Sequence, residues 1–256
     1  MRAPTLVAAA HGTRDPAGCA VTEALLDRVR ALRPGLRVVA CYLDLAAPAL
    51  PEVLAGLRGD AVLVPLLLGT GYHVRVDLPR ALAGAPHLRA RVAAPLGPHP
   101  LLAEALARRL ARCGREGGPV VLAAAGSGDP AAGDGTRAMA ALLAERLRAP
   151  VVAAYLSAAE PTPAQAVDRL RAAGHREVTV APYLLGPGFF ARAAARTAAT
   201  RTAEPLAAHE AVARLVLLRH AEACAAPWPS LPRGGGYGPG RAAPDTAAVA
   251  SGAGPA

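Results

Sequence analysis

The chain has 256 residues, enough for one large domain or for two of roughly 110 to 120 residues each. Its 28 basic residues, all arginines, exceed the 19 acidic ones. They are scattered singly without a nucleic-acid-binding motif, so they favour an acidic small-molecule ligand over nucleic acid. The base composition of the genome explains the excess of arginine equally well. The four cysteines lack zinc-type spacing and no apolar run suits a signal sequence or a membrane span, which predicts a cytoplasmic protein without membrane association.

Short apolar runs alternate with amphipathic stretches along most of the chain. The runs predict strands at residues 4–10, 36–43, 60–67, 89–94, 119–125, 150–156 and 176–184. The stretches between them predict helices at 17–32, 48–58, 98–113, 132–147, 161–173 and 205–223. Because the strands are continuously apolar, we expect an α/β fold whose parallel strands are covered by helices on both faces. An eighth strand near 200–203 is weak, so the second half is expected to lack a full fourth strand.

The two halves of the chain repeat one another. The matching segments are 6–16 with 121–130, 41–44 with 154–157, and 64–73 with 181–190. This repeat predicts two duplicated lobes, an N-terminal lobe at 1–117 that carries the active site and a degenerate C-terminal lobe at 118–224. The remaining segment, 225–256, is rich in proline, glycine and alanine, and its composition predicts a disordered tail.

Three polar residues occur in the first copy and not in the second. His11, Asp44 and His73 fall at the ends of the first three predicted strands, where the second copy has alanine, serine and phenylalanine. The carboxyl ends of parallel strands meet at one edge of a sheet, so these side chains can converge into a two-histidine, one-carboxylate site for a divalent metal. A single histidine after a strand is more often a hydrogen-bonded turn or core residue, but the joint loss favours one working site.

Charged neighbours surround these positions. Asp77 follows His73 by four residues, a spacing that places both on one face of a helix if one begins near residue 72. Asp77 then either orients the imidazole or stabilises the positive start of that helix. Arg14, Arg75 and Arg80 lie in or just after the same loops and either receive substrate carboxylates or form solvated surface.

The other histidines are predicted to be structural. His99 and His209 occupy matching places at the starts of the last predicted helix of each half, so we expect them to serve the helix starts in both copies. The remaining three are expected at the surface: His87, His175 and His220.

One competing motif points to a different class of enzyme. Residues 126–131, GSGDPA, match the G-x-G-x-x-A pattern of dinucleotide-binding oxidoreductases between a predicted strand and helix. Such a site should also have an acidic residue at the end of the next strand, where this chain has Ser157. The sequence therefore favours a protein that uses no nucleotide.

Four motifs in order resemble the CbiX/SirB sirohydrochlorin chelatases, the ATP-independent class II group. They are 10–16 (AHGTRDP), 42–44 (YLD), 65–79 (PLLLGTGYHVRVDLP) and 96–100 (LGPHP), and the resemblance covers roughly residues 4–223. It implies a duplicated chelatase fold that inserts cobalt or ferrous iron into sirohydrochlorin. It also implies that His11 and His73 bind the metal and assist deprotonation. The family commonly has glutamate where this chain has Asp44, which is one methylene shorter.

The resemblance also indicates a substrate site in the same loops. The residues expected to line it are Gly12, Thr13, Arg14, Gly69, Thr70, Gly71 and Arg75. Insertion must hold a divalent ion beside the ring and remove two pyrrole protons, and an imidazole can act as ligand or base near neutral pH. Iron, cobalt and nickel all suit imidazole and carboxylate ligands, so the metal and the choice between sirohaem and cobalamin pathways stay open.

A second class of function uses the same fold without turnover. A non-catalytic protein that binds or delivers a tetrapyrrole or a metal would keep the same residues, and metallation kinetics would separate it from an enzyme. The fused halves need no second chain to complete a cleft, so we expect a monomer.

Overall fold

The computed structural model describes residues 3–71, 73–128 and 130–228. In the first half the elements are β1 (Thr5–Ala10), α1 (Pro16–Leu32), β2 (Val38–Tyr42), α2 (Leu50–Gly56), β3 (Asp60–Leu66), the π-helical turn η1 (His73–Asp77), α3 (Leu78–Ala83), β4 (Arg89–Val92) and α4 (Pro100–Arg112). In the second half they are β5 (Val120–Ala124), α5 (Pro130–Leu147), β6 (Val151–Tyr155), α6 (Pro163–Ala172), β7 (Thr179–Tyr183), α7 (Phe189–Ala195), β8 (Arg201–Thr202) and α8 (Glu210–Ala225).

Two separate four-stranded sheets confirm the predicted duplication. Their strand orders are β2-β1-β3-β4 and β6-β5-β7-β8, and every pairing is parallel. The eighth strand is present but only two residues long, Arg201–Thr202, and it pairs with the start of β7. The apolar pattern predicts neither α3 nor α7, because helices of six and seven residues are too short for a clear period.

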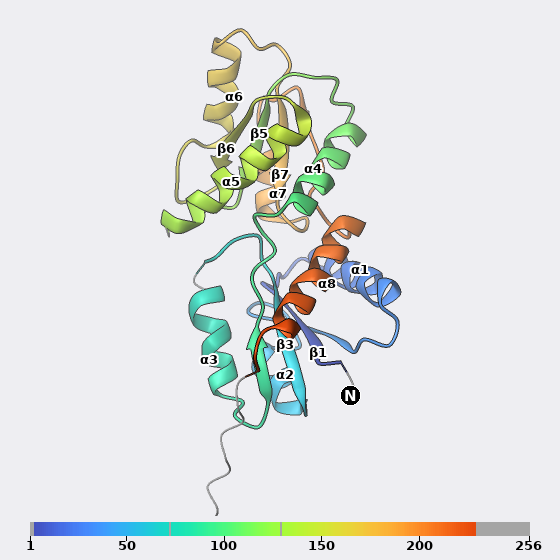
Figure 1. The fold of residues 1–256 in the computed structure, drawn as a ribbon. Coiled ribbons are helices and arrows are strands. Elements are labelled where there is room, and N and C mark those ends of the chain that lie inside the picture. The colour runs from blue at the N-terminus through green and yellow to red at the C-terminus, as the bar shows by residue number, and fades with distance from the viewer. Residues whose placement is uncertain (1–2, 72, 129, 229–256) are drawn as a thin grey trace, which may run out of the picture.

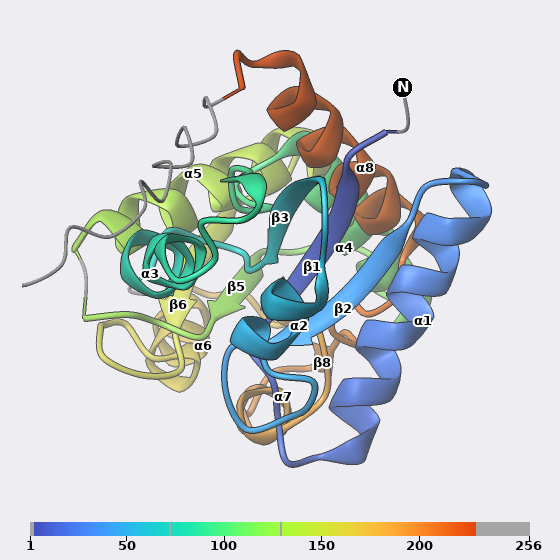
Figure 2. The same cartoon turned by 90° about the horizontal axis from the view of Figure 1, so that it is seen from below.

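Alternate residues of each strand enter different cores, which is why the strands read as continuously apolar. In the first sheet, Val7 and Ala9 pack with α2 and α3, whereas Leu6 and Ala8 face α1 and α8. Figure 2 shows these two helix layers on opposite sides of β1 and β3. The inner core is continuous from one lobe to the other, since it also contains residues of β5 and β7.

The last helix of each half packs on the sheet of the other half (Figure 1). The helix α4 lies against α5 and β7, and α8 lies against α1 and β3. In α8, Arg219 Nε donates to the carbonyl of Pro95 at 2.9 Å, and in α4 Arg109 Nη1 bonds a carboxylate oxygen of Glu204 at 2.6 Å. A cut at residue 117 therefore separates the two sequence repeats but would leave each sheet without one of its helices.

The end of α8 corrects the expected start of the tail. Ala225 is still helical, and the Trp228 ring lies 4.2 Å from the guanidinium carbon of Arg91 on β4. The same arginine donates to the carbonyl of Ala223 at 2.8 Å. The rest of the predicted tail, 229–256, lies outside the described residues. No helix in the described part of the chain is long and apolar enough to cross a membrane.

The two histidines predicted at helix starts are confirmed there, but one of the three predicted at the surface is buried. His99 and His209 cap α4 and α8, each Nδ1 accepting a backbone N–H two residues ahead at 3.1 Å. His220 is not at the surface: it is 3% exposed, and its Nε2–H donates to the carbonyl of Pro4 at 3.0 Å. The prediction for His220 was wrong because the charged neighbours Arg219 and Glu222 hide its place on the buried face of α8.

Candidate active site

Two imidazoles meet at the carboxyl edge of the first sheet. His11 directly follows β1, and His73 begins the turn η1 after the loop that leaves the adjacent strand β3. Their ring centroids lie 4.8 Å apart with the planes at 80°, so the edge of one ring faces the other. His11 is exposed and the side chain of His73 is 34% exposed, which leaves the pair open to a ligand from solution.

Asp77 contacts His73 directly. Its Oδ2 lies 2.6 Å from Nδ1 of His73, across one π-helical turn in place of the expected α-helix. A carboxylate only accepts hydrogen bonds, so the proton belongs on Nδ1 and the ring lone pair on Nε2. This arrangement, common behind metal-binding histidines, fixes the tautomer and the orientation of the ring. The π-helical geometry is itself frequent at functional sites.

Asp44 contacts the histidine pair through its backbone and not through its carboxylate. Its N–H donates to the carbonyl of His11 at 2.9 Å, while its carboxylate Oδ1 accepts the N–H of Leu45 at 2.8 Å. Among the described residues no three histidine, cysteine, aspartate or glutamate side chains are grouped so as to hold a metal ion. The structure thus brings His11, His73 and Asp77 together, and it does not turn the Asp44 carboxylate toward them.

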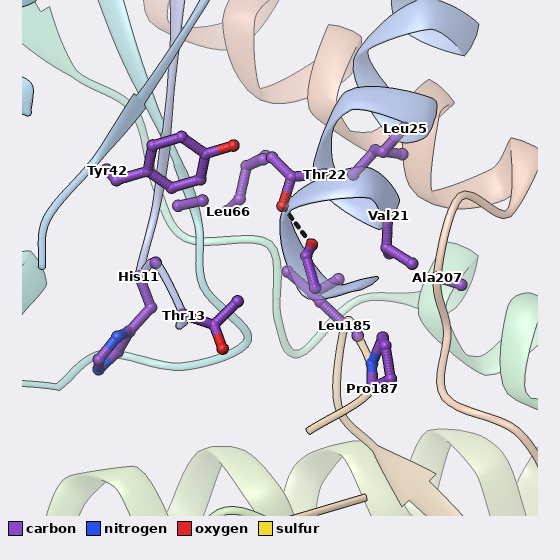
Figure 3. A pocket seen from close by; sticks show the side chains of 14 residues that line it. His11, Thr13, Val21, Thr22, Leu25, Tyr42, Leu66, Leu185, Pro187 and Ala207 are labelled. Atoms are coloured by element: carbon purple, nitrogen blue, oxygen red, sulfur yellow. Dashed lines mark hydrogen bonds between the residues drawn. The ribbon is translucent and has the colours of Figure 1, made fainter. Parts of the chain in front are cut away.

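A cavity of about 160 Å³ lies next to His11 and between the two lobes. In Figure 3, Tyr42 and Thr22 belong to the wall that the first lobe contributes, and Leu185 and Pro187 belong to the wall that the second lobe contributes. Its lining residues are Ala10, His11, Gly12, Thr13, Gly18, Val21, Thr22, Leu25, Tyr42, Leu66, Leu185, Gly186, Pro187 and Ala207. Burial, aided by Cys19 and Glu23, raises the pKa of Tyr42 to about 12, so its hydroxyl keeps its proton.

The residues expected to bind substrate divide into two groups. Gly12 and Thr13 line the cavity. Gly69, Thr70 and Gly71 form the loop before His73 and are not among the cavity-lining residues. Arg14 is exposed on the loop after His11, and Arg75 is exposed within η1.

The sequence predicted a cleft between the two lobes, but no residue of the second lobe was predicted to line it. Leu185, Gly186 and Pro187 form its cavity wall, and they are the repeat counterparts of the loop that follows β3 in the first lobe. The repeat could have identified them, because equivalent loops of two facing copies approach the same space. An ion pair also crosses between the lobes, with Arg192 Nη1 lying 3.5 Å from Oδ2 of Asp15 at the start of α1.

Two glycines fix the strand-to-loop turns in both copies. Gly12 has φ of +94°, and a Cβ there would lie 1.7 Å from the carbonyl oxygen of Asp44. Gly126 has φ of +91° and would meet the carbonyl oxygen of Ser157 at 1.9 Å. Only glycine fits this conformation and this close backbone approach. The turn that orients His11 is therefore a property of the fold, shared by the copy that has Ala125 in place of this histidine.

Comparison with known proteins identifies the fold and the family. SirB from Bacillus subtilis, solved with Fe³⁺, superposes with a TM-score of 0.73 at 24% identity over 87% of this chain and 96% of that one. SirB from Bacillus subtilis subspecies spizizenii, solved with cobalt, gives 0.70 at 21% identity over 87% and 95%. CbiX, the terminal enzyme for biosynthesis of siroheme in denitrifying bacteria, gives 0.63 at 25% identity over 86% and 98%.

Among curated proteins none matches this sequence. The CbiX family model matches it twice, at residues 5–113 and 119–223, once for each copy of the repeat. These two matches cover most of the chain and coincide with its two sheets. The chain belongs to the CbiX family.

Proposed function

We propose that this protein inserts a divalent metal ion, cobalt or ferrous iron, into sirohydrochlorin with release of two protons. The observation that carries the proposal is the pair His11 and His73, which meet edge to face at 4.8 Å beside the cavity between the lobes. Membership of the CbiX family and the likeness to the siroheme enzyme CbiX support it.

In this proposal the metal is a substrate that is held and then released into the ring. Two imidazole nitrogens suit cobalt, iron and nickel, and they leave other coordination positions for water or pyrrole nitrogens. Asp77 keeps the lone pair of His73 on Nε2, where it serves as ligand or as base for a pyrrole proton. Asp44 becomes a third ligand only if its carboxylate leaves the N–H of Leu45.

The substrate is a polycarboxylate macrocycle, too large for a cavity of about 160 Å³. We therefore expect the ring to lie over the mouth of the cavity against the exposed imidazole of His11. Arg14 and Arg75 would bind its carboxylates, because a guanidinium offers a planar pair of donors. Gly12, Thr13 and the loop 69–71 would contact the ring edge through small side chains. We further propose a monomeric, cytoplasmic enzyme that uses no nucleotide.

Anaerobic absorbance of sirohydrochlorin mixed with Co²⁺ or Fe²⁺ tests the proposal. The wild-type protein should accelerate insertion above the spontaneous rate, and His11→Ala and His73→Ala should each remove that acceleration. His175→Ala is the matched control, because it removes an exposed histidine of the other lobe. If the protein binds sirohydrochlorin but does not accelerate metal insertion, it is a carrier and not an enzyme. Equal acceleration by all three variants would refute the site.

A further inference from the structure

A tyrosine of the second lobe reaches into the loop that carries His73. Tyr183 ends β7, is 4% exposed, and its hydroxyl donates to the carbonyl of Leu68 at 3.0 Å. Leu68 lies two residues after β3 and five residues before His73. Burial raises the pKa of Tyr183, so the hydroxyl keeps the proton that this bond requires. The contact therefore joins the copy that lacks counterparts of His11 and His73 to the loop that carries His73.

The repeat shows that this bond has no equivalent in the second lobe. There the counterpart of Leu68 is Leu185, whose carbonyl accepts the N–H of Ala207 from the same lobe at 2.7 Å. The counterpart of Tyr183 in the first lobe is Leu66, which has no hydroxyl. Both lobes keep the preceding bond, from Leu96 N–H to the Leu67 carbonyl and from Leu206 N–H to the Leu184 carbonyl, each at 2.9 Å. They differ at the next carbonyl, which is bonded within the lobe at Leu185 but accepts the Tyr183 hydroxyl of the neighbouring lobe at Leu68.

Gly97 makes room for the tyrosine. It is the counterpart of Ala207, and a Cβ at this position would lie 1.9 Å from the Tyr183 hydroxyl oxygen and 2.6 Å from the carbonyl oxygen of Leu68. Its φ is not in the left-handed region, so the reason for glycine here is space and not backbone conformation. The Tyr183 hydroxyl therefore occupies the space that a side chain at residue 97 would fill.

We propose that Tyr183 is a positioning residue for the metal site, holding the loop 68–71 so that His73 stays opposite His11. The degenerate lobe then supplies a fixed hydroxyl to the working lobe, in addition to a wall of the cavity. The effect on metal insertion rests on the proposed function, whereas the anchoring of the loop by Tyr183 does not.

Tyr183→Phe tests it, since the substitution removes one oxygen and keeps the buried ring. Tyr155→Phe is the matched control: Tyr155 is 5% exposed at the end of β6, and its hydroxyl donates to the carbonyl of Gly133 within its own lobe at 3.4 Å. Amide hydrogen exchange of the metal-free proteins measures the loop. Titration with Co²⁺, followed by its visible absorbance, measures the metal site. Steady-state insertion kinetics give separate KM values for Co²⁺ and sirohydrochlorin.

Tyr183→Phe should speed exchange across residues 67–77 and weaken Co²⁺ binding about tenfold, as losses of supporting contacts behind metal ligands do. The KM for Co²⁺ should rise with it, while the KM for sirohydrochlorin stays within about twofold of wild type. Tyr155→Phe should change none of these. Unchanged exchange in 67–77, or Co²⁺ binding equal to that of Tyr155→Phe, would overturn the proposal. A wild-type protein that inserts no metal would refute the function, while exchange would still decide whether Tyr183 anchors the loop.

Discussion

Replacing Gly12 by alanine should lower both the stability of the protein and the rate of metal insertion. The substitution introduces a Cβ 1.7 Å from the carbonyl oxygen of Asp44 at a φ of +94°, so the two segments must move apart by more than about 1 Å. Left-handed strain costs about 1–2 kcal/mol and the crowding about 1–3 kcal/mol more. We expect a loss of about 2–5 kcal/mol in the free energy of unfolding, measured by urea denaturation. The displaced neighbour is His11, and a 1 Å misplacement can lower metal insertion about 100-fold.

Two further glycines isolate the separate contributions. Gly126→Ala creates the same strain and a 1.9 Å approach in the copy that lacks counterparts of His11 and His73, so it should lose similar stability and keep most of the activity. Gly35→Ala has φ of +86° and no atom within 4 Å of the new Cβ, so it should lose only about 1–2 kcal/mol. Stability comes from the unfolding midpoints and activity from the absorbance assay. If Gly12→Ala and Gly126→Ala lost equal activity, the link from this turn to the site would be refuted.

Three other outcomes follow from contacts in the structure. Asp77→Asn should lower metal insertion about 10-fold to 100-fold by weakening the hold on His73, whereas Asp27→Asn on the exposed face of α1 should not; equal effects would contradict the role of Asp77. Trp228 is the single tryptophan of the chain. Its fluorescence should give the same urea midpoint as far-ultraviolet circular dichroism, because the inner core spans both lobes. Two different midpoints would show that the lobes unfold independently. Burial lowers the pKa of His220, so the unfolded chain takes up this proton at a higher pH than the folded one, and stability present above about pH 6.5 should be lost as the pH falls toward 5. His220→Gln should flatten that loss, and an unchanged pH dependence would contradict the assignment.

The sequence pattern predicted the layers of the fold because burial on both faces of a parallel sheet leaves an unmistakable run of apolar residues. It also brought His11 and His73 together, since their strands are neighbours and parallel. The direction of the Asp44 carboxylate could not be read in the same way. It depends on a local turn in which Leu45 has φ of +58° and its N–H holds the carboxylate, and residue spacing carries no record of that turn.

The exchange of α4 and α8 could not be predicted for a related reason. A helical period shows which face of a helix is buried, but two sheets with the same strand order offer equivalent surfaces to either helix. The burial of His220 was within reach of the pattern. Val212, Val216 and His220 are spaced by four residues and share the face of α8 that enters the core, so the period outweighs the charged neighbours.

The crossing of the last helices bears on how the protein is made. On the ribosome the strands of the first sheet emerge early, but α8, which covers Leu6 and Ala8 on one face of that sheet, is synthesised after every other described element. Domains ordinarily fold in the order of their synthesis. Here α1 covers only part of that face, so the first lobe must wait with the rest of it exposed until residues 210–225 leave the ribosome. Both lobes then complete their folding together, and a nascent chain stalled within the second half leaves this apolar surface exposed.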